Sequence, residues 1–273
     1  MKRSFFAARV FVMAILLAAF FGDAATRAQT AAPNVTPDAT ELADIKVRLA
    51  TATARLAEAS RMLQDWANLA RYREANAKLV APAAGEKRVV FMGDSITDMW
   101  AESRFGGFFP GKPYVDRGIS GQTTPQMLIR FRQDVIDLKP KVVVILAGTN
   151  DIAENTGKET LEEIGDNIAS MSELARANGI RVVLCSVLPA SDFHWHPGLE
   201  PAPKIRELNE WIKQYAAKNG IVYVDYYSSL ANSDGGLKAE FSPDGVHPNK
   251  AAYDVMGPLA EAGIAEALRK PAP

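Results

Sequence analysis

Continuous apolar runs that alternate with helical segments constrain the fold of this chain more than any other feature. From residue 87 onward, the first, third and fourth β-forming runs are apolar throughout, which indicates strands buried on both faces. The expected strands are Arg88–Met92, Tyr114–Arg117, Lys141–Ala147, Arg181–Leu188 and Ile221–Asp225, and the expected helices are Thr124–Leu138, Glu159–Asn178, Pro203–Lys218 and Lys250–Leu268. This order predicts an α/β fold, a three-layer α/β/α sandwich around a five-stranded parallel, flavodoxin-like sheet.

Residues 1–28 are typical of a secretory signal peptide. A basic start precedes an uncharged apolar stretch, Val10–Phe21, and small residues then offer cleavage after Ala24, Ala25 or Ala28. A membrane anchor is the alternative, but the apolar stretch is short for a spanning helix and no cysteine follows it to carry a lipid. We therefore expect an exported protein, periplasmic or secreted, with no stable membrane anchor after cleavage.

A seven-residue repeat of leucines precedes the alternating segments. Residues 29–35 form an expected linker, residues 36–80 an expected helical extension, and residues 81–273 the expected main domain. The apolar seam of the extension consists of Leu42, Leu49, Leu56 and Leu63, interleaved with Ile45, Ala52, Ala59 and Trp66. The favoured interpretation is an amphipathic helix whose end, from Leu63 through Tyr72, docks on the domain. The alternative is a coiled coil that pairs two copies of the chain into a homo-oligomer.

Charge and cysteine content exclude several classes of protein. The formal net charge is -1, so neither a nucleic-acid partner nor a broadly basic membrane-binding surface is expected. The sole cysteine, Cys185, lies inside an expected buried strand and cannot form an intramolecular disulfide.

Three polar runs follow the first three expected strands. Ser95 comes after the first strand, Gly118–Gly121 after the second, and Gly148–Asp151 after the third. The carboxyl ends of parallel strands meet at one edge of a sheet, where ligands of such folds bind. These runs are therefore expected to converge in space.

A serine, a histidine and an aspartate supply what nucleophilic acyl transfer needs. Ser95 is the candidate nucleophile, and His247 is the candidate base that removes its proton. Asp244 lies three residues before His247, and Gly245 permits the tight turn that brings carboxylate and imidazole together. The candidate donors to an oxyanion are the backbone N–H groups of Ser95 and Gly121 and the side-chain amide of Asn150.

These runs resemble the blocks of the SGNH hydrolases, also called the GDSL esterase family. Gly93-Asp94-Ser95 is similar to the first block, Gly121 to the second, Gly148-Thr149-Asn150-Asp151 to the third and Asp244-Gly245-Val246-His247-Pro248 to the last. The resemblance covers about residues 87–268 and implies a serine esterase or acyl hydrolase that needs no metal or other cofactor. The alternative Gly-x-Ser-x-Gly signature is missing around Ser120.

The run Arg117–Thr123 further resembles the branch of carbohydrate acetylesterases and platelet-activating-factor acetylhydrolase-like proteins. That branch implies short acyl groups, mainly acetyl, on a small-molecule or carbohydrate ester, although it often carries Asn where Asp116 stands. Two alternatives stay open: a lysophospholipase or thioesterase for longer chains, and a non-catalytic carbohydrate-binding or scaffold protein.

Further candidates for substrate binding are Asp94, Trp100, His194 and Trp195. Trp100 belongs to an aromatic stretch after the nucleophile, most of which should be core. His194 and His196 would share a face of an extended segment, which permits zinc, but no further ligand is evident, and a wall of the substrate site is favoured.

Overall fold

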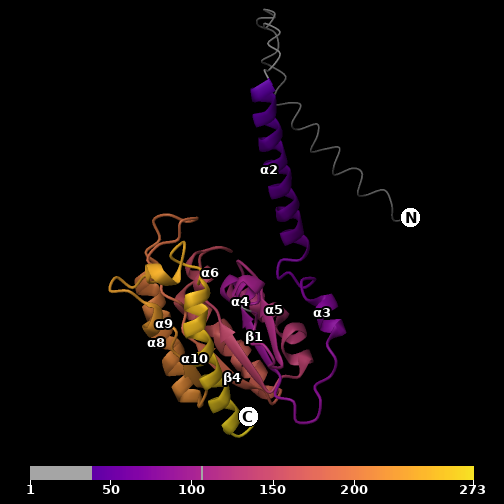
Figure 1. Cartoon of the computed structure of the whole chain (residues 1–273), viewed down its shortest axis with the longest axis vertical. Helices are drawn as coiled ribbons and strands as arrows, with labels where there is room; N and C mark the ends of the chain where they lie inside the picture. Colours follow the sequence, from indigo (N-terminus) through magenta and orange to yellow (C-terminus); the bar gives the residue numbers. More distant parts are fainter. Residues whose placement is uncertain (1–38, 106) are drawn as a thin grey trace, which may run out of the picture. The chain divides into compact units, whose positions relative to one another are not determined.

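The computed structural model describes residues 39–105 and 107–273, within which five strands form a parallel sheet in the order β2-β1-β3-β4-β5 (Figure 1). The expected signal peptide and linker lie outside the described residues. The strands are β1 Val89–Gly93, β2 Tyr114–Gly118, β3 Val142–Leu146, β4 Arg181–Cys185 and β5 Val222–Val224. This order is that of a flavodoxin-like sheet, so the predicted α/β architecture is confirmed.

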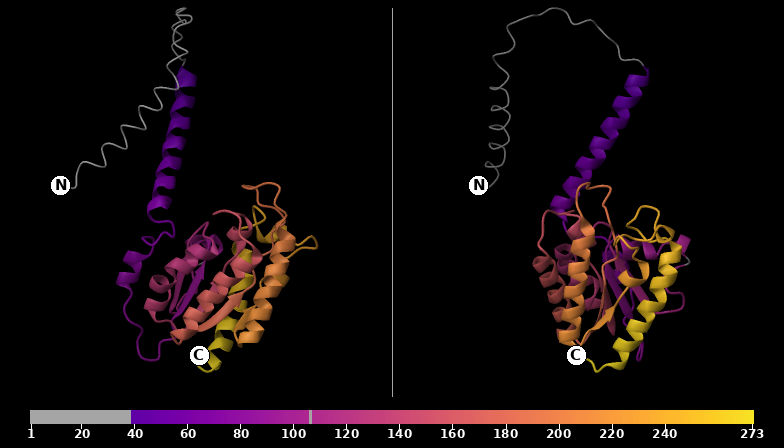
Figure 2. Two further views of the ribbon diagram at one scale, coloured as in Figure 1. Left: turned by 180° about the vertical axis from the view of Figure 1, so that it is seen from behind. Right: turned by 90° about the vertical axis from the view of Figure 1, so that its left-hand side faces the viewer.

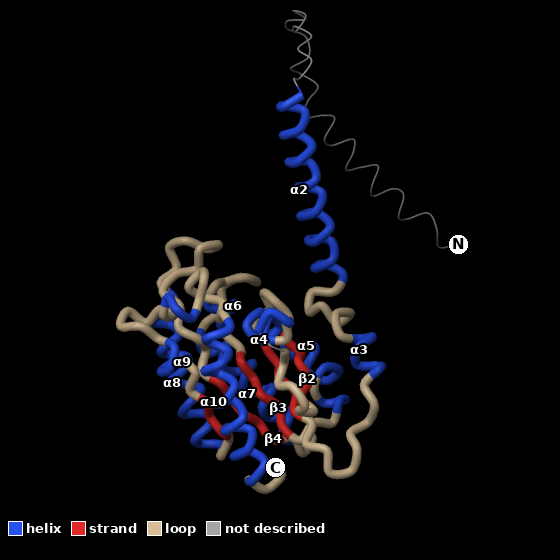
Figure 3. The backbone as a smooth tube through the Cα atoms, viewed as in Figure 1, coloured by secondary structure: helices blue, strands red, loops and turns tan. Residues whose placement is uncertain are grey.

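Helices cover both faces of the sheet and make the three layers that Figures 2 and 3 show. The helices are α2 Ala39–Gln64, α3 Arg73–Lys78, α4 Ser95–Trp100, α5 Thr124–Asp134, α6 Thr149–Ile152, α7 Leu161–Ala177, α8 Pro201–Asn219, α9 Tyr227–Leu230 and α10 Lys250–Arg269. Short 3-10 helices span Ser103–Phe105, Ile136–Leu138 and Ala239–Phe241. Helices α5, α7 and α8 pack on one face, and α4 and α10 pack on the other.

Strand β1 shows how the sheet divides the core. Val90 and Met92 belong to the cluster under α5, α7 and α8, whereas Val89 and Phe91 belong to the cluster under α4 and α10. All five residues of β1 are buried, as the continuous apolar run predicted. Burial on both faces fixes this strand near the centre of the sheet.

Strand β4 is shorter than its apolar run. It was predicted to reach Leu188 but ends at Cys185, because the adjacent β5 has only three residues. Beyond β4, the side chain of Asn209 forms two hydrogen bonds with the backbone of Val187. It accepts the N–H at 2.7 Å and donates to the carbonyl at 2.9 Å. Cys185 is 1% exposed, which confirms the predicted buried thiol.

Two glycines allow α4 to lie directly against the sheet. A Cβ at Gly118 would stand 2.1 Å from the backbone nitrogen of Asp98, and one at Gly93 would stand 2.1 Å from the hydroxyl of Thr97. Neither position therefore tolerates a side chain without moving α4, whose first residue is Ser95.

The chain separates by its contacts into a unit that ends at Leu56 and a second unit, Ala57–Pro273, which contains the sheet. The predicted helix across the leucine seam is confirmed as α2. The prediction that docking begins at Leu63 is wrong, because Leu63 is 89% exposed. Helix α2 ends at Gln64, and Asp65 then accepts the N–H groups of Leu69 and Ala70. Beyond the helix, the side chains of Ala67 and Tyr72 are buried. The boundary expected at residue 81 stays a prediction.

Among residues 39–105 and 107–273, no helix combines the length and the apolar character that crossing a membrane demands.

Candidate active site

Ser95, His247 and Asp244 lie in a hydrogen-bonded row at the carboxyl edge of the sheet. Ser95 opens α4, and its Oγ stands 3.1 Å from Nε2 of His247. Nδ1 of the same ring stands 2.7 Å from Oδ2 of Asp244. With the Nδ1 proton held by the carboxylate, Nε2 is free to accept the serine proton. The arrangement is able to activate Ser95 as a nucleophile.

A tight turn holds Asp244 in this row. Its Oδ1 accepts the backbone N–H groups of Val246 at 3.0 Å and His247 at 2.8 Å. Ser242 accepts the N–H of Gly245 at 2.9 Å, and its hydroxyl donates to the carbonyl of His247 at 2.8 Å. Burial alone would raise the pKa of Asp244, but the hydrogen bonds from His247 and Val246 outweigh it and hold this pKa well below its usual range. Asp244 is therefore ionised in the folded protein near neutral pH.

Gly121 and Asn150 bring further donors to the same edge. Gly121 has a φ of +80° with open space around its Cβ position, so backbone conformation rather than crowding favours glycine there. Asn150, in α6, donates its side-chain amide to the carbonyl of Gln122 at 3.0 Å and to Asp94 at 3.3 Å. The N–H of Ser95 is among those that a helix start leaves without an intrahelical acceptor.

Asp94 lies beneath this group of donors. It is 1% exposed and caps α4, accepting the N–H of Ile96 at 3.0 Å. Burial raises the pKa of Asp94 to about 6. Its carboxylate thus contacts Asn150 and the start of α4 and is shielded from solvent.

The other expected substrate residues divide between the site and the core. The ring of Trp195 is 40% exposed, with its centroid 6.4 Å from that of His247. His194 contacts Trp195 edge-on, and Nδ1 of His196 stands 2.9 Å from the carbonyl of Ala153. Trp100 is instead buried and stacks on Tyr253 of α10 in an aromatic cluster.

Two residues of the site were missed from the sequence. Asn155 donates to Oδ1 of Asn150 at 2.8 Å and accepts the indole N–H of Trp195 at 3.0 Å. Ser242 supports the turn of Asp244. No motif marks either residue, although Ser242 two positions before an aspartate is a usual side-chain-to-backbone turn pattern.

The sequence profile of the GDSL-like Lipase/Acylhydrolase family matches residues 91–255, which is more than half of the chain. The chain belongs to this family. Membership places it among the carboxylic ester hydrolases, as the motifs predicted. In a solved Bacteroides fragilis structure assigned as an acylhydrolase, 51% of aligned residues are identical, with a TM-score of 0.73, covering 75% of this chain and 99% of that one.

Curated relatives extend the comparison. A Bacillus subtilis protein named as a lipoprotein, YqeF, is 36% identical over 140 residues, covering 45% of this chain and 58% of that protein. A human platelet-activating factor acetylhydrolase IB subunit alpha2 is 27% identical, covering 64% and 76%. An acetylxylan esterase of Geobacillus stearothermophilus is 26% identical, covering 63% and 91%. The predicted similarity to the acetylesterase and platelet-activating-factor branch is confirmed.

Proposed function

We propose that this protein is an exported serine esterase that hydrolyses short-chain carboxylic esters, such as acetyl esters of carbohydrates. The observation that carries the proposal is the row from Ser95 through His247 to Asp244, beside Gly121 and Asn150. The hydrogen-bonded geometry argues against a non-catalytic binding protein, since such a protein has no need of a serine held within 3.1 Å of an oriented imidazole.

The reaction proceeds through an acyl-enzyme. Oγ of Ser95 attacks the ester carbonyl while Nε2 of His247 takes the hydroxyl proton. Asp244 stabilises the resulting imidazolium. The tetrahedral oxyanion accepts hydrogen bonds from the N–H groups of Ser95 and Gly121 and from the side-chain amide of Asn150.

Collapse of this intermediate breaks the ester C–O bond, and His247 gives its proton to the departing alcohol. Water then attacks the acyl group, again losing a proton to His247, and the second collapse releases the carboxylic acid and Ser95. Asp244 stays ionised throughout.

The short acyl preference rests on relatives. Two curated relatives carry an acetyl ester hydrolase name, and the sequence resemblance points to the same branch. Trp195, exposed beside His247, gives the alcohol part of an ester an aromatic surface to contact. The expected signal peptide supports export.

Ser95→Ala tests the nucleophile, with Ser120→Ala as the matched control. Ser120 follows the adjacent strand, and its hydroxyl donates to Asp98 at 2.7 Å instead of approaching His247. Ser95→Ala should lower kcat on p-nitrophenyl acetate by on the order of 10⁴ or more, and a serine-reactive phosphonate should label Ser95 only. Labelling of Ser120, with activity retained in Ser95→Ala, would refute the assignment.

A chain-length series tests the acyl preference. We expect a higher kcat/KM on the acetyl than on the octanoyl p-nitrophenyl ester. The reverse order would instead favour the lysophospholipase or thioesterase alternative.

A further inference from the structure

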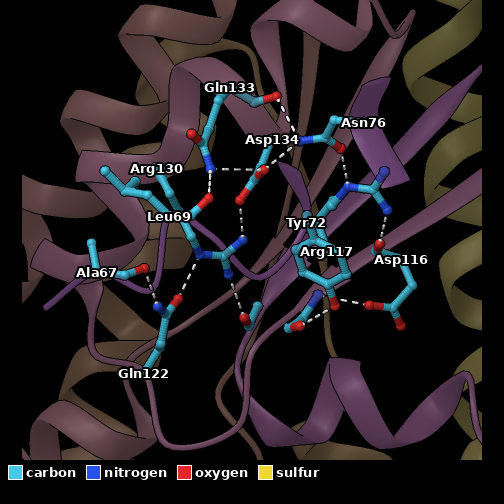
Figure 4. A network of polar contacts seen from close by, with 12 residues as sticks. Ala67, Leu69, Tyr72, Asn76, Asp116, Arg117, Gln122, Arg130, Gln133 and Asp134 are labelled. Carbon is cyan, nitrogen blue, oxygen red and sulfur yellow. Dashed lines mark hydrogen bonds and ion pairs between the residues drawn. The ribbon is translucent and has the colours of Figure 1, made fainter. Parts of the chain in front are cut away.

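A segment that precedes the family's matched region is hydrogen-bonded to the loops of the candidate site (Figure 4). We call residues 66–76 the anchoring segment. Three glutamine side chains donate to its backbone carbonyls: Gln122 to Ala67 at 2.7 Å, Gln126 to Trp66 at 2.7 Å and Gln133 to Leu69 at 2.9 Å. Gln126 and Gln133 are seven residues apart in α5 and so share one helix face. The segment is thus held at three points along α5 and the loop before it.

Gln122 differs from the other two glutamines because it also touches the site. It follows Gly121 directly, is 3% exposed, and its own backbone carbonyl accepts the amide of Asn150 at 3.0 Å. Its side-chain oxygen accepts Nε of Arg130 at 2.5 Å. One residue therefore joins the anchoring segment, a buried guanidinium and two of the three candidate oxyanion donors, Gly121 and Asn150.

Arg130 extends this connection to the nucleophile. It is fully buried, and it donates to the carbonyl of Gly93 at 3.0 Å and to Asp134 at 3.2 Å. Gly93 lies two residues before Ser95. Burial lowers the pKa of Arg130, but Asp134 acts against that shift, and the ion pair keeps the guanidinium charged.

Tyr72 of the anchoring segment reaches the same loop from the other side. Its hydroxyl donates to the carbonyl of Gly118, and the guanidinium of Arg117 lies 4.6 Å from the centroid of its ring. The loop from Gly118 to Gln122 is thus fastened to the anchoring segment at both ends. The N–H of Gly121 lies between these two points.

We propose that Gln122 is a positioning residue, which uses the anchoring segment and Arg130 to hold Gly121 and Asn150 where the oxyanion develops. The inference rests on the proposed function, because it assigns a purpose to the candidate oxyanion donors. It makes residues outside the matched family region a part of the catalytic apparatus.

Gln122→Met tests this, with Gln133→Met as the matched control. Both changes are nearly isosteric and remove one donor to the anchoring segment, but only the first lies beside Asn150. Gln122→Met should lower kcat on p-nitrophenyl acetate on the order of tenfold with KM little changed, because displaced donors weaken transition-state binding. Gln133→Met should keep kcat within about twofold. Because Gln122→Met also removes the acceptor of the buried Nε of Arg130, the Tm of both variants is measured, and kcat is compared at a temperature at which both are folded.

The decisive measurement is a double-mutant cycle with Asn150→Ala. If Gln122 acts through Asn150, Gln122→Met should cost markedly less in the Asn150→Ala enzyme than in the wild type. Equal costs in the two backgrounds would overturn the inference, as would an unchanged kcat in Gln122→Met. Should Gln122→Met not fold, Tyr72→Phe removes the hydroxyl that donates to the Gly118 carbonyl at the other end of the same loop; a lowered kcat then supports the inference, and an unchanged kcat overturns it.

The two proposals fail differently. An enzyme without esterase activity would overturn the proposed function and this inference together. An active wild type whose kcat is insensitive to Gln122 would overturn the inference alone.

Discussion

Replacing Asp244 by asparagine should abolish most of the activity while leaving the fold intact. The structure separates two tasks of this carboxylate. Oδ1 accepts two backbone N–H groups and shapes the turn, whereas Oδ2 holds Nδ1 of His247 at 2.7 Å. An asparagine oxygen still accepts the backbone donors, but its NH₂ group then faces Nδ1. The imidazole must accept there, and its proton moves to Nε2, which faces Ser95 and is no longer able to take the serine proton.

The expected loss in kcat is about 10⁴, equivalent to about 5.4 kcal/mol of transition-state stabilisation. Asp244→Ala provides the contrast, because it removes the turn acceptors as well. Those acceptors are partly solvated, so their loss should cost about 1 kcal/mol and lower Tm by about 2–4 °C, while Asp244→Asn keeps the wild-type Tm. Initial rates on p-nitrophenyl acetate and thermal melts by circular dichroism measure both effects. A loss in kcat below about tenfold in Asp244→Asn would refute the tautomer argument.

Three further predictions concern Asn150, Asp116 and the segment before β1. Asn150→Ala should lower kcat by about 10²–10³ with little change in KM, and a change confined to KM would make it a ground-state binding residue. Burial raises the pKa of Asp116 to about 7, so the folded state holds this proton more tightly than the unfolded state does. The stability of the wild type therefore falls as pH rises from about 4 through 7. Asp116→Asn, whose oxygen still accepts the N–H of Gly118, should melt above the wild type at pH 8 and lose this advantage at pH 4. A chain beginning at Ala59 should stay folded and active. A chain beginning at Ala81 should have a lower Tm than the one beginning at Ala59, because it lacks the buried Ala67 and Tyr72. Equal Tm values for the two chains would show that these contacts add no stability.

The sequence predicted the sheet because burial on two faces imposes a readable pattern. The unbroken apolar run of β1 and the helical spacing of apolar residues in α7 and α10 indicate which side chains are buried. Strand ends are less predictable, as β4 shows, because the backbone of Val187 pairs with a side chain on α8 rather than with a strand. Such a pairing leaves no mark in local periodicity.

The site divides in the same way. Ser95, Asn150 and His247 lie in motifs. The rule on parallel strand ends predicted that Ser95 and Asn150 converge, whereas His247 was predicted from its spacing to Asp244. Asn155 lies in no motif. Gln122 belongs to the run Arg117–Thr123, but nothing in that run marks its side-chain bond to Ala67, 55 residues earlier in the chain. Trp100 was ambiguous for another reason: an aromatic residue after the nucleophile suits a core and a pocket equally well, and only the stacking on Tyr253 decides for the core.

Cys185 gives the folded chain a built-in reporter of its own opening. It is the one cysteine in the sequence, and it ends β4 with the pKa of its thiol raised by burial to about 12. A thiol reagent in neutral buffer therefore does not react with this sulfur until β4 separates from its neighbouring strands and helices. The rate at which such a reagent labels the native protein would time the separation of β4 from its neighbours, with no engineered probe required.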